Sequence, residues 1–123
     1  MRLLQLSGEL AIVRLPAGAA VPSWLPDRPF VSLTRTEDEL SIICLSTLVP
    51  PEERAETGWI AFRVADALDF SMTGVVSSLA SPLAGAGISI FVVSTFDTDY
   101  ILVRLPAADA ARAAWRAAGH EVT

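Results

Sequence analysis

The chain has 123 residues, which suits one domain or two very small ones that share a core. Its net charge of −5, with all nine basic residues being scattered arginines, argues against a nucleic-acid partner, which needs clustered Lys and Arg. No run reaches the roughly 18 apolar residues that span a bilayer. The N-terminal stretch lacks the apolar region of a signal peptide, and a single cysteine cannot form an intramolecular disulfide. We therefore expect a cytoplasmic protein with no membrane partner.

The first elements are predicted to be one strand and a proline-rich loop. Residues 3–15 alternate between apolar and polar well enough for a strand, and Gly8 suggests a bulge or bend. Four prolines rule out a long helix between Pro16 and Pro29. Trp24 is expected to pack this loop onto the core.

A hairpin is predicted next, with strands at residues 30–35 and 39–45. Cys44 lies in the second, strongly apolar strand, where a buried thiol is expected. Two prolines then precede a predicted short acidic helix over residues 52–56, which Gly58 ends.

The second half of the chain contains longer elements. A strand is predicted over residues 59–64 and a helix over residues 73–86, with Pro82 expected to kink or split this helix. An alanine-rich helix follows over residues 106–118, with Ala108, Ala111, Trp115 and Ala118 on its inner face, and residues 121–123 supply a short last strand.

Between the two helices, residues 87–103 form the clearest predicted hairpin. Its ends are almost wholly apolar, as buried strands are, and it turns at Phe96-Asp97-Thr98. Hydroxyls and carboxylates gather at the strand ends next to the turn, where a small ligand can be held: Ser94, Thr95, Asp97, Thr98 and Asp99.

From residue 59 the order is strand, helix, strand, strand, helix, strand, which is the split β-α-β arrangement of a ferredoxin-like fold. The first part of the chain gives a stunted copy of the same order. We therefore predict an α+β (α/β class) protein with two ferredoxin-like modules and antiparallel sheets. The modules span residues 1–58 and 59–123, with a soft boundary and close packing as one unit, and the strand at Trp59 can serve both.

Catalytic and metal-binding constellations are lacking. His120 is the only histidine, and it is expected to be solvated or on an edge strand, so no Ser-His-Asp or Cys-His pairing can be assembled. Asp97 and Asp99 lie at a turn, where such residues commonly form the turn itself. We expect no enzyme activity, no cofactor and no metal.

The loop before the first long helix is a more promising site. Gly74 allows a ligand to approach the backbone, and the free N–H groups of a helix start favour a carboxylate. Asp69 can hold an ammonium group. Both contacts together would bind a free amino acid, although Ser71 or Thr73 can instead cap the helix.

Two blocks of the sequence resemble ACT domains, the small-molecule-sensing modules of amino-acid metabolism, and are most similar to the branch that includes the CASTOR arginine sensors. The first block, residues 30–36, is similar to the shorter first module of that branch. The second block runs from Trp59 to Arg104 and includes the Gly74-Val75 helix start, Pro82-Leu83-Ala84, Ser94-Thr95-Phe96 and Thr98-Asp99-Tyr100-Ile101-Leu102-Val103.

The resemblance implies that a ligand lies between two ACT modules. In the arginine sensors, acidic residues precede the helix-start glycine, whereas this chain has Ser71 and Met72 there, so arginine and a smaller or less basic amino acid both stay open. The sensors carry four modules, so a homodimer of this chain would restore the count. The implied ligand-binding residues are Ser89 and Ile90 from one module, and Asp69, Ser71, Met72, Gly74, Val75, Thr95, Phe96 and Asp99 from the other.

The sequence thus predicts an amino-acid-binding regulatory or sensor protein, which can act on a regulated partner protein. Two alternatives stay open: a dimerisation or scaffold module without ligand, and an enzyme, for which only His120 is offered as a base. The role of Asp99, binding a ligand or holding the turn, is open in the same way.

Overall fold

The computed structural model describes residues 1–66 and 72–123 and divides the chain into two compact units. The large unit comprises residues 1–7 and 60–123, and the small unit comprises residues 8–59. Strand β5 (Ala55–Val64) contributes residues to both units. The division falls next to residue 59, and residues 1–7 belong to the same unit as the second part of the chain.

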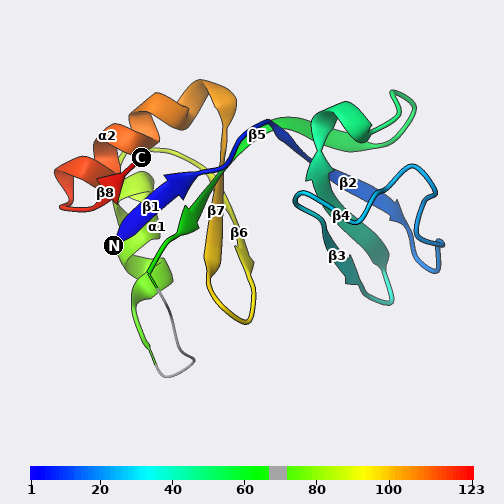
Figure 1. Cartoon of the computed structure of the whole chain (residues 1–123), viewed down its shortest axis with the longest axis horizontal. Coiled ribbons are helices and arrows are strands. Elements are labelled where there is room, and N and C mark those ends of the chain that lie inside the picture. Colours follow the sequence, from blue (N-terminus) through cyan, green and yellow to red (C-terminus); the bar gives the residue numbers. More distant parts are fainter. Residues whose placement is uncertain (67–71) are drawn as a thin grey trace. The chain divides into compact units, whose positions relative to one another are not determined.

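The large unit contains a sheet with the strand order β6-β7-β5-β1-β8 (Figure 1). Its elements are β1 (Arg2–Gln5), the second half of β5, α1 (Val75–Gly85), β6 (Ile90–Ser94), β7 (Asp99–Arg104), a 3₁₀ turn (Leu105–Ala107), α2 (Ala108–Ala117) and β8 (Glu121–Val122). From β5 onward the order is strand, helix, strand, strand, helix, strand, so the expected ferredoxin-like α+β fold is confirmed.

Strand β1 is an addition to that fold. It pairs antiparallel with β5 through Leu3 and Val64, and parallel with β8 through Leu3 and Val122. Residues 1–7 therefore join the large unit because both sets of backbone hydrogen bonds of β1 lie there. The sequence predicted one strand over residues 3–15, whereas Gly8, at φ +84°, separates β1 from β2 (Leu10–Pro16).

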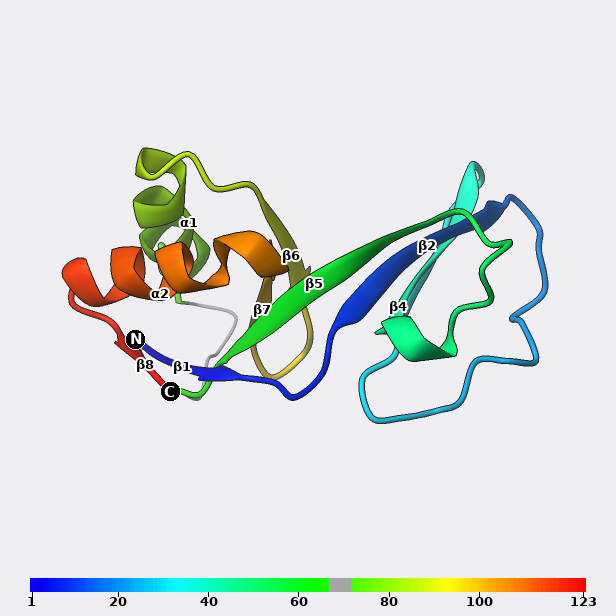
Figure 2. The same ribbon diagram turned by 90° about the horizontal axis from the view of Figure 1, so that it is seen from above.

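Both helices pack on one face of the large unit's sheet (Figures 1 and 2). The apolar faces of both helices pack against the sheet, and this contact fully buries the side chains of Leu79, Leu83 and Trp115. The indole N–H of Trp115 donates to the Leu79 carbonyl oxygen at 2.9 Å, which joins α2 to α1. Ala118, which was expected on the inner face of α2, is exposed beyond the end of the helix.

Helix α1 continues through Pro82 to Gly85, so the proline does not split it. Pro82 has no N–H and cannot donate to the carbonyl oxygen of Ser78, four residues earlier. The Nε2 atom of His120 lies 3.2 Å from that oxygen and can donate in its place. Gly87, at φ +73°, follows the helix end as expected.

The small unit is a four-stranded antiparallel sheet with the order β3-β4-β2-β5. Its further elements are β3 (Ser32–Arg35), β4 (Glu39–Leu45) and a 3₁₀ turn (Ser46–Leu48). One face of the sheet carries a core of Val13, Ile42 and the buried Cys44, and Trp24 packs against it as predicted.

The predicted helix over residues 52–56 is wrong. Ala55 and Glu56 belong to β5, where they pair with Val13 and Ile12 of β2. A five-residue helix has few internal hydrogen bonds to offset its nucleation cost, so pairing with an existing strand prevails. No helix within residues 1–66 and 72–123 has the length and hydropathy to cross a bilayer.

Candidate functional site

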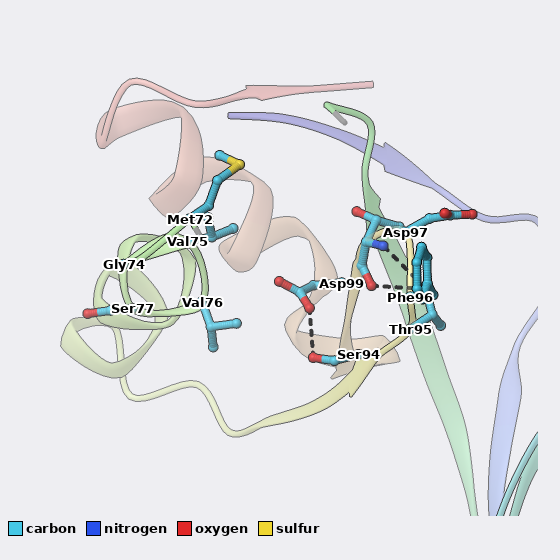
Figure 3. Close-up of a pocket in the computed structure, with 11 residues that line it drawn as sticks. Met72, Gly74, Val75, Val76, Ser77, Ser94, Thr95, Phe96, Asp97 and Asp99 are labelled. Atoms are coloured by element: carbon cyan, nitrogen blue, oxygen red, sulfur yellow. Dashed lines mark hydrogen bonds between the residues drawn. The ribbon is translucent and has the colours of Figure 1, made fainter. Parts of the chain in front are cut away.

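A pocket of about 360 Å³ lies in the large unit between the start of α1 and the turn that joins β6 to β7 (Figure 3). We call it the α1 pocket. Residues 72 and 74–77 line it on one side and residues 94–99 on the other. These segments are far apart in the sequence, and the fold brings them together because both lie at the same end of the sheet–helix layers.

The α1 side of the pocket begins at Gly74, which adopts a left-handed conformation at φ +74°. No side chain of a described residue caps this helix end, and Thr73 is exposed. The capping role considered for Thr73 is therefore not observed, while Ser71 lies outside the described residues. The first N–H groups of a helix have no acceptor within it, so they form a partly positive edge to the pocket.

Hydrogen bonds within the β6–β7 turn hold the other side of the pocket. The Thr95 backbone N–H donates to the Thr98 carbonyl oxygen at 2.8 Å, and the Thr95 hydroxyl donates to the same oxygen at 3.1 Å. Thr98 is itself buried, and its hydroxyl donates to the Val64 carbonyl oxygen of β5 at 2.8 Å. Thr98 thus ties the turn to the end of β5.

Two carboxylates line the pocket. Asp99 is half-buried and points toward α1, where Val76 points back toward it (Figure 3). The Ser94 hydroxyl donates to Oδ1 of Asp99 at 2.7 Å, and Asp97 is exposed. The described lining residues include no Arg, Lys or His. The charges at the turn therefore favour a positively charged group, whereas the helix start favours a negative one.

Six of the residues named from the sequence come together in this pocket: Met72, Gly74, Val75, Thr95, Phe96 and Asp99. Ser89 and Ile90 do not line it, because they lie at the beginning of β6 and the pocket contacts its end at Ser94. Asp69 and Ser71 fall outside the described residues.

Five further lining residues were not named as ligand contacts: Val76, Ser77, Ser94, Asp97 and Thr98. Three of them, Ser94, Asp97 and Thr98, belong to the polar end of the hairpin, where the sequence predicts that a small ligand can be held. Val76 and Ser77 lie in the first turn of α1, where their position next to Gly74 was the available signal.

Other chemistry finds little support in the described part of the chain. No group of three or more His, Cys, Asp and Glu side chains there is placed to hold a metal ion. His120 is half-buried, with Nδ1 at 3.0 Å from the Met1 amine and Nε2 near the Ser78 carbonyl oxygen. Burial of the Cys44 thiol raises its pKa above the ordinary value of 9.0, which makes the thiol a poor nucleophile.

Comparison with known proteins identifies related chains. A family model of the ACT domain matches residues 54–114, and a second model, of an N-terminal domain, matches residues 8–52. The human protein CASTOR3P is 33% identical over 87 residues, which cover 60% of this chain and 53% of that protein. The chain thus spans about half the length of this curated relative.

Two solved structures show the same fold. Protein Atu0741 of Agrobacterium tumefaciens is 43% identical, with a TM-score of 0.93 over 99% of this chain and 91% of that one. The regulatory subunit of aspartate kinase from Thermus thermophilus, in its ligand-free form, is 10% identical, with a TM-score of 0.56 over 90% of this chain and 91% of that one. By its sequence match and its fold, the chain belongs to the ACT-domain family.

Proposed function

We propose that this chain is a non-catalytic regulatory domain that binds a free amino acid in the α1 pocket. The observation that carries the proposal is the pairing, within one pocket of an ACT domain, of an uncapped helix start with the carboxylate of Asp99. A pocket of about 360 Å³ falls within the roughly 300–1,000 Å³ of small-molecule sites.

Each part of an amino acid has a complementary group in the pocket. The ligand carboxylate would accept hydrogen bonds from the first N–H groups of α1. Its ammonium group would contact the carboxylate of Asp99, of which Oδ1 also accepts a hydrogen bond from the Ser94 hydroxyl. Met72 and Val76, both exposed and apolar, would cover the ligand side chain. This arrangement favours an amino acid with an uncharged side chain over arginine, since of the two carboxylates that line the pocket only Asp99 is half-buried, and the exposed Asp97 would hold a second basic group weakly.

We further propose a homodimer, with the ligand held between ACT modules. Strand β6 pairs only with β7 among the described strands, so its outer edge offers backbone groups to another strand. The strand carries no charge and no proline, and Phe91 on it is exposed. Ser89 and Ile90, at the start of this edge, would then contact the ligand of a neighbouring module. The proposed setting is the cytoplasm, where ligand binding would alter the contact with a regulated protein.

A dimerisation module without ligand is the alternative, and one contact favours it. The Ser94 hydroxyl already satisfies part of Asp99, as expected if these groups serve only to hold the turn. In that case the β6 edge would be the functional surface and the α1 pocket would stay empty.

A thermal-shift screen against the twenty proteinogenic amino acids separates the two functions. Binding predicts that Tm rises with one or a few of them at millimolar concentration. Asp99→Asn should reduce that rise while leaving the unliganded Tm nearly unchanged. Asp38→Asn, at an exposed turn of the small unit, is the matched control and should keep the full rise.

Absence of a shift with every amino acid would reject ligand binding. The dimer is then tested alone by analytical ultracentrifugation of the wild type and of Phe91→Arg, which places a charge on the exposed β6 edge. A dimeric wild type and a monomeric variant would support the dimerisation module. A monomeric wild type would reject the proposed dimer.

A further inference from the structure

The end of the β6–β7 hairpin carries two polar side chains on a face of the sheet that is otherwise apolar. Ile90 and Val92 of β6 pack against the core of the large unit, and Ile101 of β7 belongs to it. Successive side chains of a strand point to opposite faces, so Ser94 and Asp99 continue these rows on the same face. The two residues also pair with each other across the hairpin. Both apolar rows therefore end in one Ser–Asp pair, at the α1 pocket.

This pair is joined by a short hydrogen bond. The Ser94 hydroxyl donates to Oδ1 of Asp99 at 2.7 Å, and a bond to a carboxylate is stronger than one between neutral groups. The last torsion of an aspartate side chain is otherwise broadly distributed, so this bond fixes the plane of the carboxylate. The second carboxylate oxygen of Asp99 points toward α1 (Figure 3). Ser94 thus orients Asp99 into the α1 pocket.

The Ser94 hydroxyl can also accept a hydrogen bond from a ligand. A hydroxyl has one proton and two lone pairs, and the proton of Ser94 is directed to Asp99. The backbone uses the other two hydroxyls of this turn. Thr95 donates to the Thr98 carbonyl oxygen and accepts from the Thr98 N–H at 3.3 Å, and Thr98 donates to the Val64 carbonyl oxygen. Ser94 and Asp99 together therefore present hydrogen-bond acceptors to the pocket.

We propose that Ser94 and Asp99 form a site for a primary ammonium group, which restricts the α1 pocket to ligands with a primary amine. This inference rests on the proposed binding of an amino acid in that pocket. A primary ammonium has three N–H donors, so one can reach the Asp99 carboxylate and another the Ser94 oxygen. A secondary ammonium has only two and carries a carbon atom in place of the third. It leaves an acceptor unpaired or brings that carbon against it, and both outcomes lower affinity.

Proline and N-methyl amino acids test this restriction. Proline is the proteinogenic amino acid with a secondary amine, so it should leave Tm unchanged in the thermal-shift screen. The amino acid that gives the largest rise in Tm is then compared with its own N-methyl form by isothermal titration calorimetry. We expect the N-methyl form to bind the wild type about tenfold more weakly, or weaker still.

Variants of Ser94 separate this role from a purely structural one. Ser94→Ala should raise the Kd of the same amino acid about two- to tenfold, the value of one hydrogen bond. Ser94→Thr keeps the hydroxyl and should bind like the wild type. Ser41→Ala, which removes a strand serine from the small unit, is the matched control and should leave Kd unchanged.

The readout that a structural role would not change is the loss of affinity on N-methylation. In Ser94→Ala the added methyl group no longer meets the hydroxyl, so this loss should become about threefold smaller or less than that of the wild type. A serine that only holds the turn would lower the Tm of the unliganded protein and leave the loss on N-methylation as it is.

The proposal is overturned if proline raises Tm as much as the best primary amine. It is also overturned if Ser94→Ala keeps the wild-type Kd and the wild-type loss on N-methylation, or if Ser94→Thr weakens binding as much as Ser94→Ala. In these cases amino-acid binding stands and only the role of the Ser94–Asp99 pair is refuted. Absence of a Tm rise with every amino acid refutes the proposed function itself, and this inference with it.

Discussion

Replacement of Thr98 by Val tests how the turn of the α1 pocket is held. Valine has nearly the same shape as threonine but lacks the hydroxyl, which donates to the Val64 carbonyl oxygen at 2.8 Å. Thr98 is 7% exposed, so water cannot easily replace the lost donor. Loss of one partner of a buried hydrogen bond costs about 1–3 kcal/mol. With a urea m-value of about 2 kcal/mol/M, a cost of about 2 kcal/mol lowers the denaturation midpoint by about 1 M.

Urea denaturation followed by tryptophan fluorescence measures this change, because Trp115 is buried in the same unit. Thr98→Ser keeps the hydroxyl and loses only a methyl group, so it should cost about 1 kcal/mol or less. The turn of Thr98→Val should also loosen, which would appear as faster hydrogen exchange of the Thr95 N–H. If Thr98→Val is as stable as the wild type, or if Thr98→Ser is the more damaging variant, the hydrogen bond to β5 does not hold the turn.

Four further predictions concern the fold and its titration. Gly74→Ala should lower the free energy of unfolding by about 1 kcal/mol, because φ is +74° and the alanine would be strained there. An added Cβ meets no atom within 4 Å, so no steric clash adds to this cost. A loss above about 3 kcal/mol in denaturation would contradict this reasoning. His120→Ala removes the donor to the Ser78 carbonyl oxygen and should cost about 1 kcal/mol, whereas an unchanged midpoint would show that water serves equally well. Cys44 should react with a thiol reagent only after unfolding, and rapid reaction of the native protein would refute its burial. Because burial raises its pKa above 9.0, the contribution of Cys44 to the free energy of unfolding should be constant below about pH 9 and decrease above it, as measured by comparing the wild type with Cys44→Ala in denaturation at several pH values.

Much of the large unit could be predicted from local sequence patterns. The hairpin of β6 and β7 follows from two β-rich runs around a polar turn, and α1 ends where Gly87 supplies a left-handed residue. The buried face of α2, with Ala111 and Trp115, follows from helical periodicity. These features depend on residues that are close in the sequence, so a sequence pattern is sufficient to identify them.

The small unit was harder to predict because its strands compete with local alternatives. An acidic segment after two prolines favours a short helix, yet Ala55 and Glu56 gain more by pairing with β2. Gly8 fits a bulge within one strand as well as it fits a break between two. The structure shows a break between two strands, because β1 pairs with β5 and β8 and is thereby separated from β2.

The sequence by itself determined the family, the order of elements in the large unit and the polar character of the hairpin tip. Only the tertiary structure decided that this tip meets the start of α1, that Thr98 anchors it to β5, and that Ser89 and Ile90 lie at the opposite end of β6. The physical reason is that these contacts join residues distant in the sequence, and their register is set by strand pairing across the sheet, which no local pattern contains.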